Sequence, residues 1–243
     1  MLTEKQIEKG FWCWDQENNH PPEKITLLED YKTCEKLNLV ITQIGTDMKY
    51  QNKLIDAWCE KLPELTEVKY LWLNSRVNQK IFDAICKLVN LEGLFIKWSG
   101  VKKIDNIQNL KNLKHFCLGS SSQVEDIDAL GKLSNVITLD LENLKKISDF
   151  SVISNLSKLE GLGLDGSMYT AQKIDTLEPL RNLTELKYLT LTNSRILDKS
   201  FEAILNLRKL VRFNCSYNYP ANEFEKLKNL PNLKYSNVHY VLK

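Results

Sequence analysis

The sequence predicts an α/β solenoid, a curved horseshoe with a concave parallel β-sheet of about nine strands and a convex side that mixes helical and 3₁₀ connectors. The main observation is a motif of the form L-x-x-L-x-L, which recurs eight times along the chain. Successive copies start 22 to 27 residues apart, and a fixed period in this range is the signature of a solenoid. The copies begin at Val68, Leu91, Leu113, Val136, Leu159, Leu186, Leu210 and Leu233.

The second observation is the segment that precedes the first of these copies. Residues 34–39 read Cys-Glu-Lys-Leu-Asn-Leu, which predicts a ninth strand that comes first in the chain. The stretch between this strand and the next is longer than one repeat. It predicts a helix over about residues 48–62, because Leu54, Trp58 and Leu62 share one helical face.

The third observation is the variety of the connectors between strands. Residues 56–62 are echoed closely by residues 83–88, so both segments are assigned to the convex side. Residues 104–113 repeat a short apolar pattern that predicts a 3₁₀ or other tight turn. Residues 199–207 are longer and predict an α-helix. The solenoid is therefore expected to mix two kinds of connector.

These motifs resemble the leucine-rich repeat superfamily, in its short cytosolic or bacterial-type form, over roughly residues 34–241. The resemblance implies that the uncovered concave face of the sheet is a binding surface. One column departs from the family pattern, which usually has Asn after each strand to satisfy backbone groups in the turn. Serine is expected to take over part of this role, since the column reads Arg76, Ser99, Ser121, Leu144, Ser167, Ser194 and Asn218.

The repeat pattern divides the chain into an N-terminal cap, residues 1–33, and the solenoid, residues 34–241. A bare solenoid end exposes its core and needs a cap with a polar outer face. We therefore expect Phe11, Trp12 and Trp14 to plug the first coil. The alternative is an aromatic arm that helps to grip a partner.

Composition limits the classes of protein to which the chain can belong. The 33 basic and 31 acidic residues leave a net charge of +2, unlike the concentrated basic excess of a nucleic-acid-binding protein. No stretch approaches the roughly 20 apolar residues that cross a bilayer, and the N-terminus does not read as a secretory signal. The six cysteines fit a reducing compartment, with a Cys59–Cys86 disulfide as the alternative. A cytoplasmic protein is expected, and the excess of Lys over Arg indicates a bacterial source.

The concave face is the candidate binding surface, because the residues between the inward Leu positions of each motif point toward it. They form lateral rows whose neighbours lie about 4.8 Å apart. Three zones are predicted to bind a partner: an aromatic zone, an acidic centre and a tyrosine zone. Tyr, Trp and Arg dominate interface hot spots. The zones contain, in order, Tyr70, Trp72, Phe95 and Trp98; Asp140, Glu142 and Asp165; and Tyr188, Arg212, Tyr235 and His239.

Two other interpretations of these residues compete with partner binding. Trp72 and Phe95 could simply pair across strands beneath the N-terminal arm. His115, Cys117 and Asp140 lie close enough in the predicted rows for a cysteine nucleophile, but an open sheet offers no water-excluding pocket. The acidic centre suits a Lys or Arg of a partner better than Ca²⁺. We therefore predict no enzyme, no cofactor and no metal site.

The leading hypothesis is a protein-recognition module that binds a partner protein through its concave face. A more specific hypothesis is an immunity or inhibitor protein that neutralises a toxin or an enzyme. The alternatives are a host-directed bacterial effector and a structural scaffold in a larger assembly. The pattern predicts neither nucleic acid nor membrane as partner, and it leaves the oligomeric state open with a monomer slightly favoured.

Overall fold

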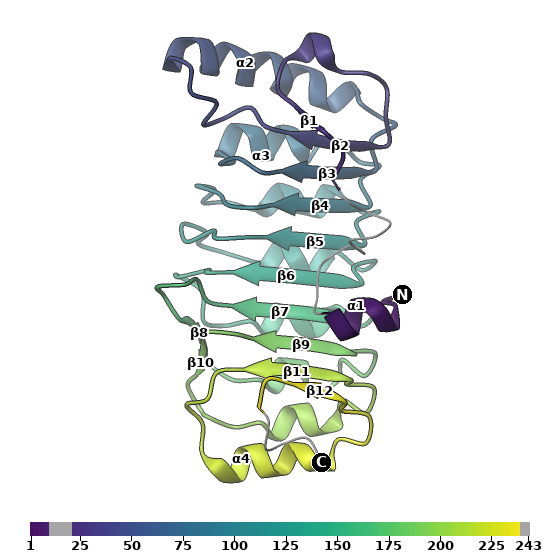
Figure 1. Ribbon diagram of the computed structural model, residues 1–243, viewed down its shortest axis with the longest axis vertical. Helices are drawn as coiled ribbons and strands as arrows, with labels where there is room; N and C mark the ends of the chain where they lie inside the picture. Colours follow the sequence, from purple (N-terminus) through teal and green to yellow (C-terminus); the bar gives the residue numbers. More distant parts are fainter. Residues whose placement is uncertain (10–20, 239–243) are drawn as a thin grey trace.

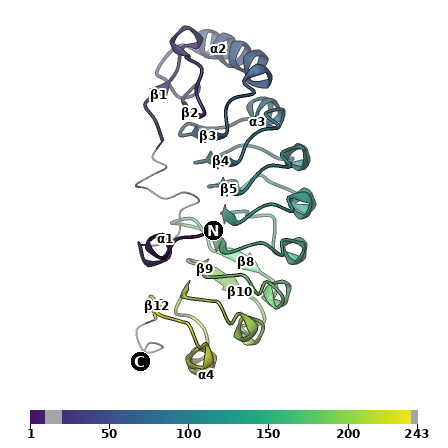
Figure 2. The ribbon, with the colours of Figure 1, turned by 90° about the vertical axis from the view of Figure 1, so that its right-hand side faces the viewer.

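The computed structural model describes residues 1–9 and 21–238, and within them the chain forms one curved stack of coils (Figures 1 and 2). The main sheet has ten parallel strands in the described residues, in the order β1-β2-β3-β4-β5-β6-β7-β9-β11-β12. Nine of these are the predicted repeat strands. They are β2 (Lys36–Leu39), β3 (Tyr70–Leu73), β4 (Gly93–Ile96), β5 (His115–Leu118), β6 (Thr138–Glu142), β7 (Gly161–Asp165), β9 (Tyr188–Leu191), β11 (Arg212–Cys215) and β12 (Tyr235–Ser236).

The tenth strand, β1 (Lys24–Ile25), was not predicted as a strand. It lies in the segment predicted as the cap and pairs in parallel with β2, with Lys24 opposite Asn38. Trp58 of the first convex helix fixes this segment, because its indole Nε1 donates to the carbonyl of Thr26 at 2.8 Å. Phe11, Trp12 and Trp14, the predicted core plug, lie outside the described residues.

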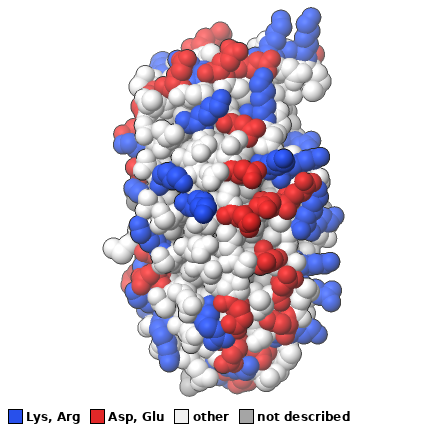
Figure 3. Space-filling model, turned by 180° about the vertical axis from the view of Figure 1, so that it is seen from behind, with Lys and Arg blue, Asp and Glu red and all other residues white. Residues whose placement is uncertain are grey.

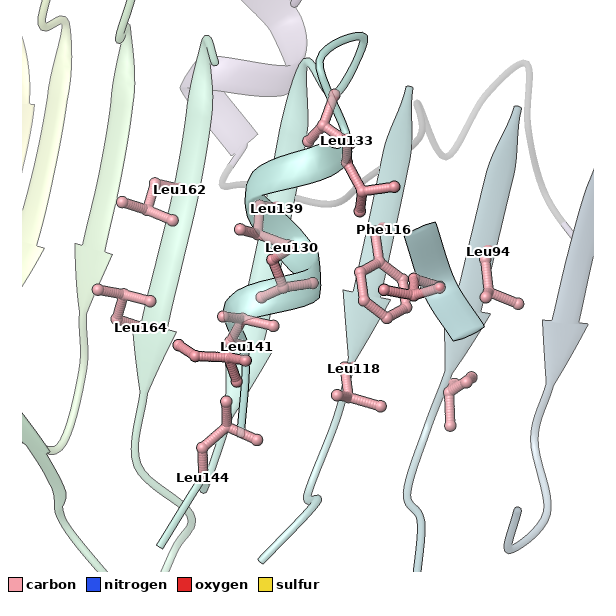
Figure 4. Close-up of a cluster of buried hydrophobic side chains, with 14 of the residues drawn as sticks. Leu94, Phe116, Leu118, Leu130, Leu133, Leu139, Leu141, Leu144, Leu162 and Leu164 are labelled. Carbon is pink, nitrogen blue, oxygen red and sulfur yellow. The ribbon is translucent and has the colours of Figure 1, made fainter. Parts of the chain in front are cut away.

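The core is one continuous apolar layer between the sheet and the convex connectors. The inward motif positions of neighbouring strands lie side by side in register, as Leu94, Phe116, Leu139 and Leu162 do in Figure 4. These four side chains are fully buried, and Leu130 closes the layer from the connector above them. Each repeat therefore buries its apolar side against its neighbours, as a solenoid requires.

The convex side mixes helices and 3₁₀ turns, as predicted (Figure 2). The helix α2 (Met48–Lys61) begins after Asp47, whose carboxylate accepts the amide of Tyr50 at 2.9 Å. Asn78 caps α3 (Gln79–Ile85) in the same way. The 3₁₀ turns are η1 (Leu28–Asp30), η2 (Leu62–Glu64), η3 (Asp105–Asn109), η4 (Asp128–Lys132), η5 (Ser151–Asn155), η6 (Glu178–Leu180), η7 (Glu202–Asn206) and η8 (Leu227–Asn229).

The α-helix predicted over residues 199–207 is wrong, since this connector contains only the short 3₁₀ turn η7. Lys199 has a φ of 54°, a left-handed conformation that an α-helix cannot contain. A helix does form one repeat later, where α4 (Ala221–Lys226) follows Pro220. Pro220 is the N-cap of this helix, and its carbonyl accepts the amide of Glu223 at 3.0 Å.

Two side-chain ladders satisfy backbone groups where the strands turn. In the column that usually holds Asn, Ser99 Oγ lies 2.7 Å from Ser121 Oγ, and Ser194 Oγ donates to the carbonyl of Leu164 at 2.5 Å. Serine therefore takes part of the expected role at buried positions. A second ladder, at the start of the strands, was not predicted. In it Asn90, Asn112, Asn135 and Asn232 donate to the carbonyls of Thr66, Val89, Lys111 and Arg208 at 2.7–3.1 Å.

The longest step among the eight regular motif copies, 27 residues between Leu159 and Leu186, accommodates a second small sheet. Its strands β8 (Gln172–Ile174) and β10 (Ser194–Ile196) pair in parallel at one end of the main strands. The loop that leads into β8 leaves two large side chains in solvent, with Met168 85% and Tyr169 91% exposed.

The back of the molecule carries acidic and basic side chains interspersed (Figure 3). Neighbouring repeats are linked there and along the edges by ion pairs, such as Lys80–Asp56, Lys146–Glu125 and Lys209–Glu185. The concave side of the sheet differs from the back, because an N-terminal segment covers part of it. A short N-terminal helix, α1 (Glu4–Lys9), lies against the concave side near β7 and β9 (Figures 1 and 2).

Candidate functional site

The strand register places the concave side chains in the predicted lateral rows. One row runs from Tyr70 through Gly93, His115, Thr138, Gly161, Tyr188 and Arg212 to Tyr235. The next runs from Trp72 through Phe95, Cys117, Asp140, Gly163 and Thr190 to Asn214. The predicted partner-binding residues therefore share one surface, except His239, which lies outside the described residues, and Trp98, which lies in the loop after β4.

The aromatic zone is largely packed rather than open. The rings of Tyr70 and Trp72 lie 6.4 Å apart, and Trp72 is only 2% exposed. Phe95 and Tyr70 are half-buried, whereas Trp98 is exposed, with the Lys97 ammonium 5.8 Å from its ring centre. Trp98 is therefore the member of this zone that a partner reaches without any rearrangement.

The acidic centre lies in a hollow of about 590 Å³ over the middle strands. Asp140 comes from β6 and accepts the Cys117 thiol at 3.6 Å. Asp165 ends β7 and is fixed by the backbone amide of Thr192 at 2.5 Å and by the hydroxyl of Thr190 at 3.1 Å. Sheet pairing brings Glu142 beside Asp165. Three carboxyl groups from two strands thus line one depression.

These carboxyl groups sit in an environment that disfavours their charge. Burial raises the pKa of Asp140 from its ordinary 3.8 to about 6. Burial and the neighbouring Asp140 carboxylate raise the pKa of Asp165 to about 7. Burial also raises the pKa of Glu142. Among the described residues, no Lys or Arg forms an ion pair with any of the three, so their charge is not compensated there.

The tyrosine zone is organised around Arg212 of β11. Its guanidinium lies 5.0 Å from the ring centre of Tyr235 and 6.0 Å from that of Tyr188, which is the geometry of cation–π contacts. The same guanidinium donates from Nε to the carbonyl of Ile7 at 2.6 Å, and its second nitrogen donates to the carbonyl of Glu8. The predicted hot-spot residues of this zone are therefore in contact with the N-terminal helix.

The start of the N-terminal segment is held by a residue that sequence reasoning missed. Glu160, just before β7, accepts the amide of Leu2 at 2.6 Å and the ammonium of Lys187 at 3.0 Å. Leu2 and Ile7 are buried in one apolar cluster that also contains Tyr188. No signal in the sequence distinguished Glu160, because the same column of the motif holds a charged residue in most repeats, such as Glu92 and Lys187.

The arrangement of His115 and Cys117 is not that of a cysteine nucleophile. The Nδ1 atom of His115 lies 2.8 Å from the hydroxyl of Thr138, and burial lowers the pKa of His115 to about 4. The Cys117 thiol donates to Asp140, which requires a protonated thiol rather than the reactive thiolate. The geometry therefore favours a structural role for these side chains.

Other ligand classes find little support in the described part of the chain. No group of His, Cys, Asp and Glu there is arranged to hold a metal ion. None of the helices described is both long and apolar enough to span a bilayer. Cys59 and Cys86 are free and buried, so the alternative of a disulfide between them is wrong. Burial raises the pKa of both thiols.

Known structures share this architecture. The crystal structure of an internalin C2 from Listeria monocytogenes matches 72% of this chain and 72% of its own length, with 24% sequence identity and a TM-score of 0.56. The chain folds as a leucine-rich repeat solenoid. The structure of a plant peptide hormone receptor, RGFR1 in complex with RGF2, also matches. The match covers 82% of this chain and 30% of the receptor chain, with 18% identity and a TM-score of 0.50. No protein-family model matches this sequence, and no curated protein does.

Proposed function

We propose that this solenoid is a non-enzymatic recognition module that binds a partner protein through its concave face. The observation that carries the proposal is the acidic centre. Asp140 and Asp165 lie in a hollow, have raised pKa values and receive no cation from the described residues. A desolvated carboxylate gains most from an incoming Lys or Arg, because the low local dielectric strengthens the attraction.

The surroundings of the acidic centre support a protein rather than a small ligand. Phe95 and Tyr188 line the hollow itself, and Arg212 and Tyr235 continue the tyrosine zone beyond Tyr188. A sheet of ten strands spans roughly 43 Å at about 4.8 Å per gap, which suffices for a standard protein interface. Aromatic and Arg side chains around a charged centre are the composition of an interface hot spot.

A narrower proposal is that the protein inhibits its partner, as an immunity protein neutralises a toxin or an enzyme in the bacterial cytoplasm. An acidic concave face complements a basic partner surface, and proteins that act on nucleic acids carry such surfaces. An inhibitor of this kind covers the partner's own functional surface. One tight partner in a one-to-one complex is therefore expected.

The test is co-purification of the tagged full chain from its native lysate, followed by mass spectrometry. Asp140→Asn combined with Asp165→Asn should weaken the captured complex at least about tenfold, because a partner cation loses its counter-charges. Glu60→Gln is the matched control, since Glu60 is an exposed carboxylate on the convex helix α2.

The result separates the proposals. One stoichiometric protein whose activity stops on binding supports an inhibitor. Several weakly bound proteins indicate a scaffold, and recovery of the chain outside the producing cell indicates an effector. Equal capture by the double variant and by the wild type contradicts binding at the acidic centre.

A further inference from the structure

The N-terminal segment binds to the concave face as a ligand would, through its backbone. Glu160 accepts the amide of Leu2, and Arg212 donates to the carbonyls of Ile7 and Glu8. An acidic group thus meets the start of the segment and a cation meets its end. Arg212 thus meets two of the last carbonyls of the helix, which lack partners within it, whereas Glu160 holds the chain two residues before the helix begins.

The residues that hold the segment are positioned by the solenoid itself. Arg212 lies between Tyr188 and Tyr235, and Glu160 forms an ion pair with Lys187. We call Glu160, Tyr188, Arg212 and Tyr235 the helix cradle. Its members belong to, or directly precede, strands β7, β9, β11 and β12, so the cradle does not depend on the segment for its construction.

The segment is suited to a bound helical form. Thr3 and Gln6 form a reciprocal capping box, in which Gln6 Oε1 accepts the amide of Thr3 at 2.8 Å and Thr3 Oγ1 accepts the amide of Gln6 at 3.2 Å. A helix of six residues does not persist alone in water, so α1 depends on the contacts that the cradle provides.

The segment also stands apart from the core that holds the solenoid together. Leu2 and Ile7 belong to a small apolar cluster on the concave face, separate from the continuous core between the sheet and the connectors. Release of the segment therefore uncovers the cradle without opening the core. The hydrogen bonds with Glu160 and Arg212 reach backbone atoms of the segment, and Leu2 and Ile7 supply its apolar contacts.

We propose that the helix cradle is a docking site for a short amphipathic helix of the partner protein, and that residues 1–9 occupy it as an autoinhibitory segment which the partner helix displaces. The proposal rests on the proposed function and adds the form of the ligand and a mode of regulation. The expected partner helix presents two aliphatic side chains, spaced as Leu2 and Ile7 are. A backbone amide just before the helix would bind Glu160, and the last carbonyls of the helix would bind Arg212.

The first test follows the segment in the full chain by amide hydrogen exchange. Residues 2–9 should exchange slowly in the wild type and at least tenfold faster in Ile7→Asp, because a charged side chain cannot occupy the apolar cluster. Exchange in the repeat core should not change. Glu8→Gln is the matched control, since the Glu8 side chain is exposed and only its backbone carbonyl reaches Arg212.

The second test offers the ligand in trans, as a labelled peptide with the sequence of residues 1–9. It should bind Ile7→Asp at least tenfold more tightly than it binds the wild type or Glu8→Gln, because a tethered segment competes at an effective concentration of about 1 mM. Adding Arg212→Ala to Ile7→Asp should abolish binding. A peptide that itself carries Ile7→Asp should bind neither protein.

Three results overturn the proposal. They are free exchange of residues 2–9 in the wild type, equal binding of the peptide to the wild type and to Ile7→Asp, and no binding to either. A concentration-dependent dimer that disappears in Ile7→Asp would instead show exchange of the segment between two copies. The exchange and peptide experiments need no partner protein. A negative result in them therefore does not contradict the proposed function, and a negative co-purification does not contradict the helix cradle.

Discussion

The carboxylates of the concave face and those of the outer surface have opposite electrostatic environments. At the strand ends and on the outer surface, Lys114 lowers the pKa of Glu92 and Lys146 lowers the pKa of Glu125 through direct ion pairs between neighbouring repeats. In the acidic centre, burial raises the pKa of Asp140 and of Asp165. Ion pairs thus compensate these two carboxylates, whereas no Lys or Arg in the described part of the chain forms an ion pair with Asp140 or Asp165. Such a cost to folding is typical of a surface built for binding.

The largest expected effect is a gain in stability when one concave charge is removed. Asp140→Asn should raise the free energy of unfolding by about 3 kcal/mol at pH 8, since a pKa raised from 3.8 to about 6 measures what burial of the charge costs. Urea denaturation at pH 8 and at pH 4.5 tests this, and the gain should be much smaller at pH 4.5. Glu60→Gln should leave the free energy of unfolding unchanged at both pH values. A lower free energy of unfolding for Asp140→Asn at pH 8 would show that burial of the Asp140 charge does not destabilise the fold.

A second expected effect is a rise in the stability of the wild type as the pH falls from 8 to 6. The pKa of Asp165 in the folded state, about 7, lies above its unfolded value of 3.8, so the folded protein binds the additional proton and gains on the order of 1 kcal/mol as the pH falls from 8 to 6. His115 acts in the opposite direction. Its folded pKa of about 4 lies below 6.5, so the stability it contributes is lost as the pH falls from about 6.5 toward 4.

Urea midpoints measured in steps from pH 8 to pH 4.5 give this profile. Asp165→Asn should remove most of the rise between pH 8 and pH 6, because Asp140, with a pKa of about 6, contributes only the remainder over this range. A wild-type profile that declines steadily from pH 8 would show that the acidic centre is fully hydrated.

The smallest expected effect belongs to the ion pairs between neighbouring repeats. Glu92→Gln removes the contact with Lys114 at 2.7 Å and should lower stability by less than about 1 kcal/mol at pH 7, because both side chains are partly hydrated. The sign is opposite to that of Asp140→Asn. The stabilisation exists above pH 4.5, is lost as the pH falls through the lowered pKa of Glu92, and shrinks in high salt. If Glu92→Gln lowered the free energy of unfolding by more than Asp140→Asn raises it, the ion pair would matter more to stability than the buried carboxylate, contrary to the comparison.

Much of the fold could be predicted because a solenoid is a local structure. The alternation within each motif gave the strand positions and the lateral rows, and a face of apolar residues at helical spacing gave α2. The strand β1 was missed because two residues carry too little pattern. The connector at residues 199–207 was taken for an α-helix because its apolar spacing suits one, but the positive φ of Lys199 is a property of the folded turn.

The candidate site was less predictable. The alternation of side chains along each strand predicted which residues face the concave side. Tyr188, Arg212 and Tyr235 do lie together there. The position of residues 1–9 had no local signature, because α1 contacts residues about 160 to 205 positions away. Glu160 was overlooked for the same reason.

Repetition of the motif therefore determined the architecture, since every strand packs on a neighbour of nearly the same sequence. The tertiary structure decided the electrostatics of the concave face and what covers it. A pKa depends on burial and on charges brought in from other strands, and the docking of α1 depends on Glu160 and Arg212 meeting its two ends at once. These are distances between segments far apart in the chain, which only the folded protein sets.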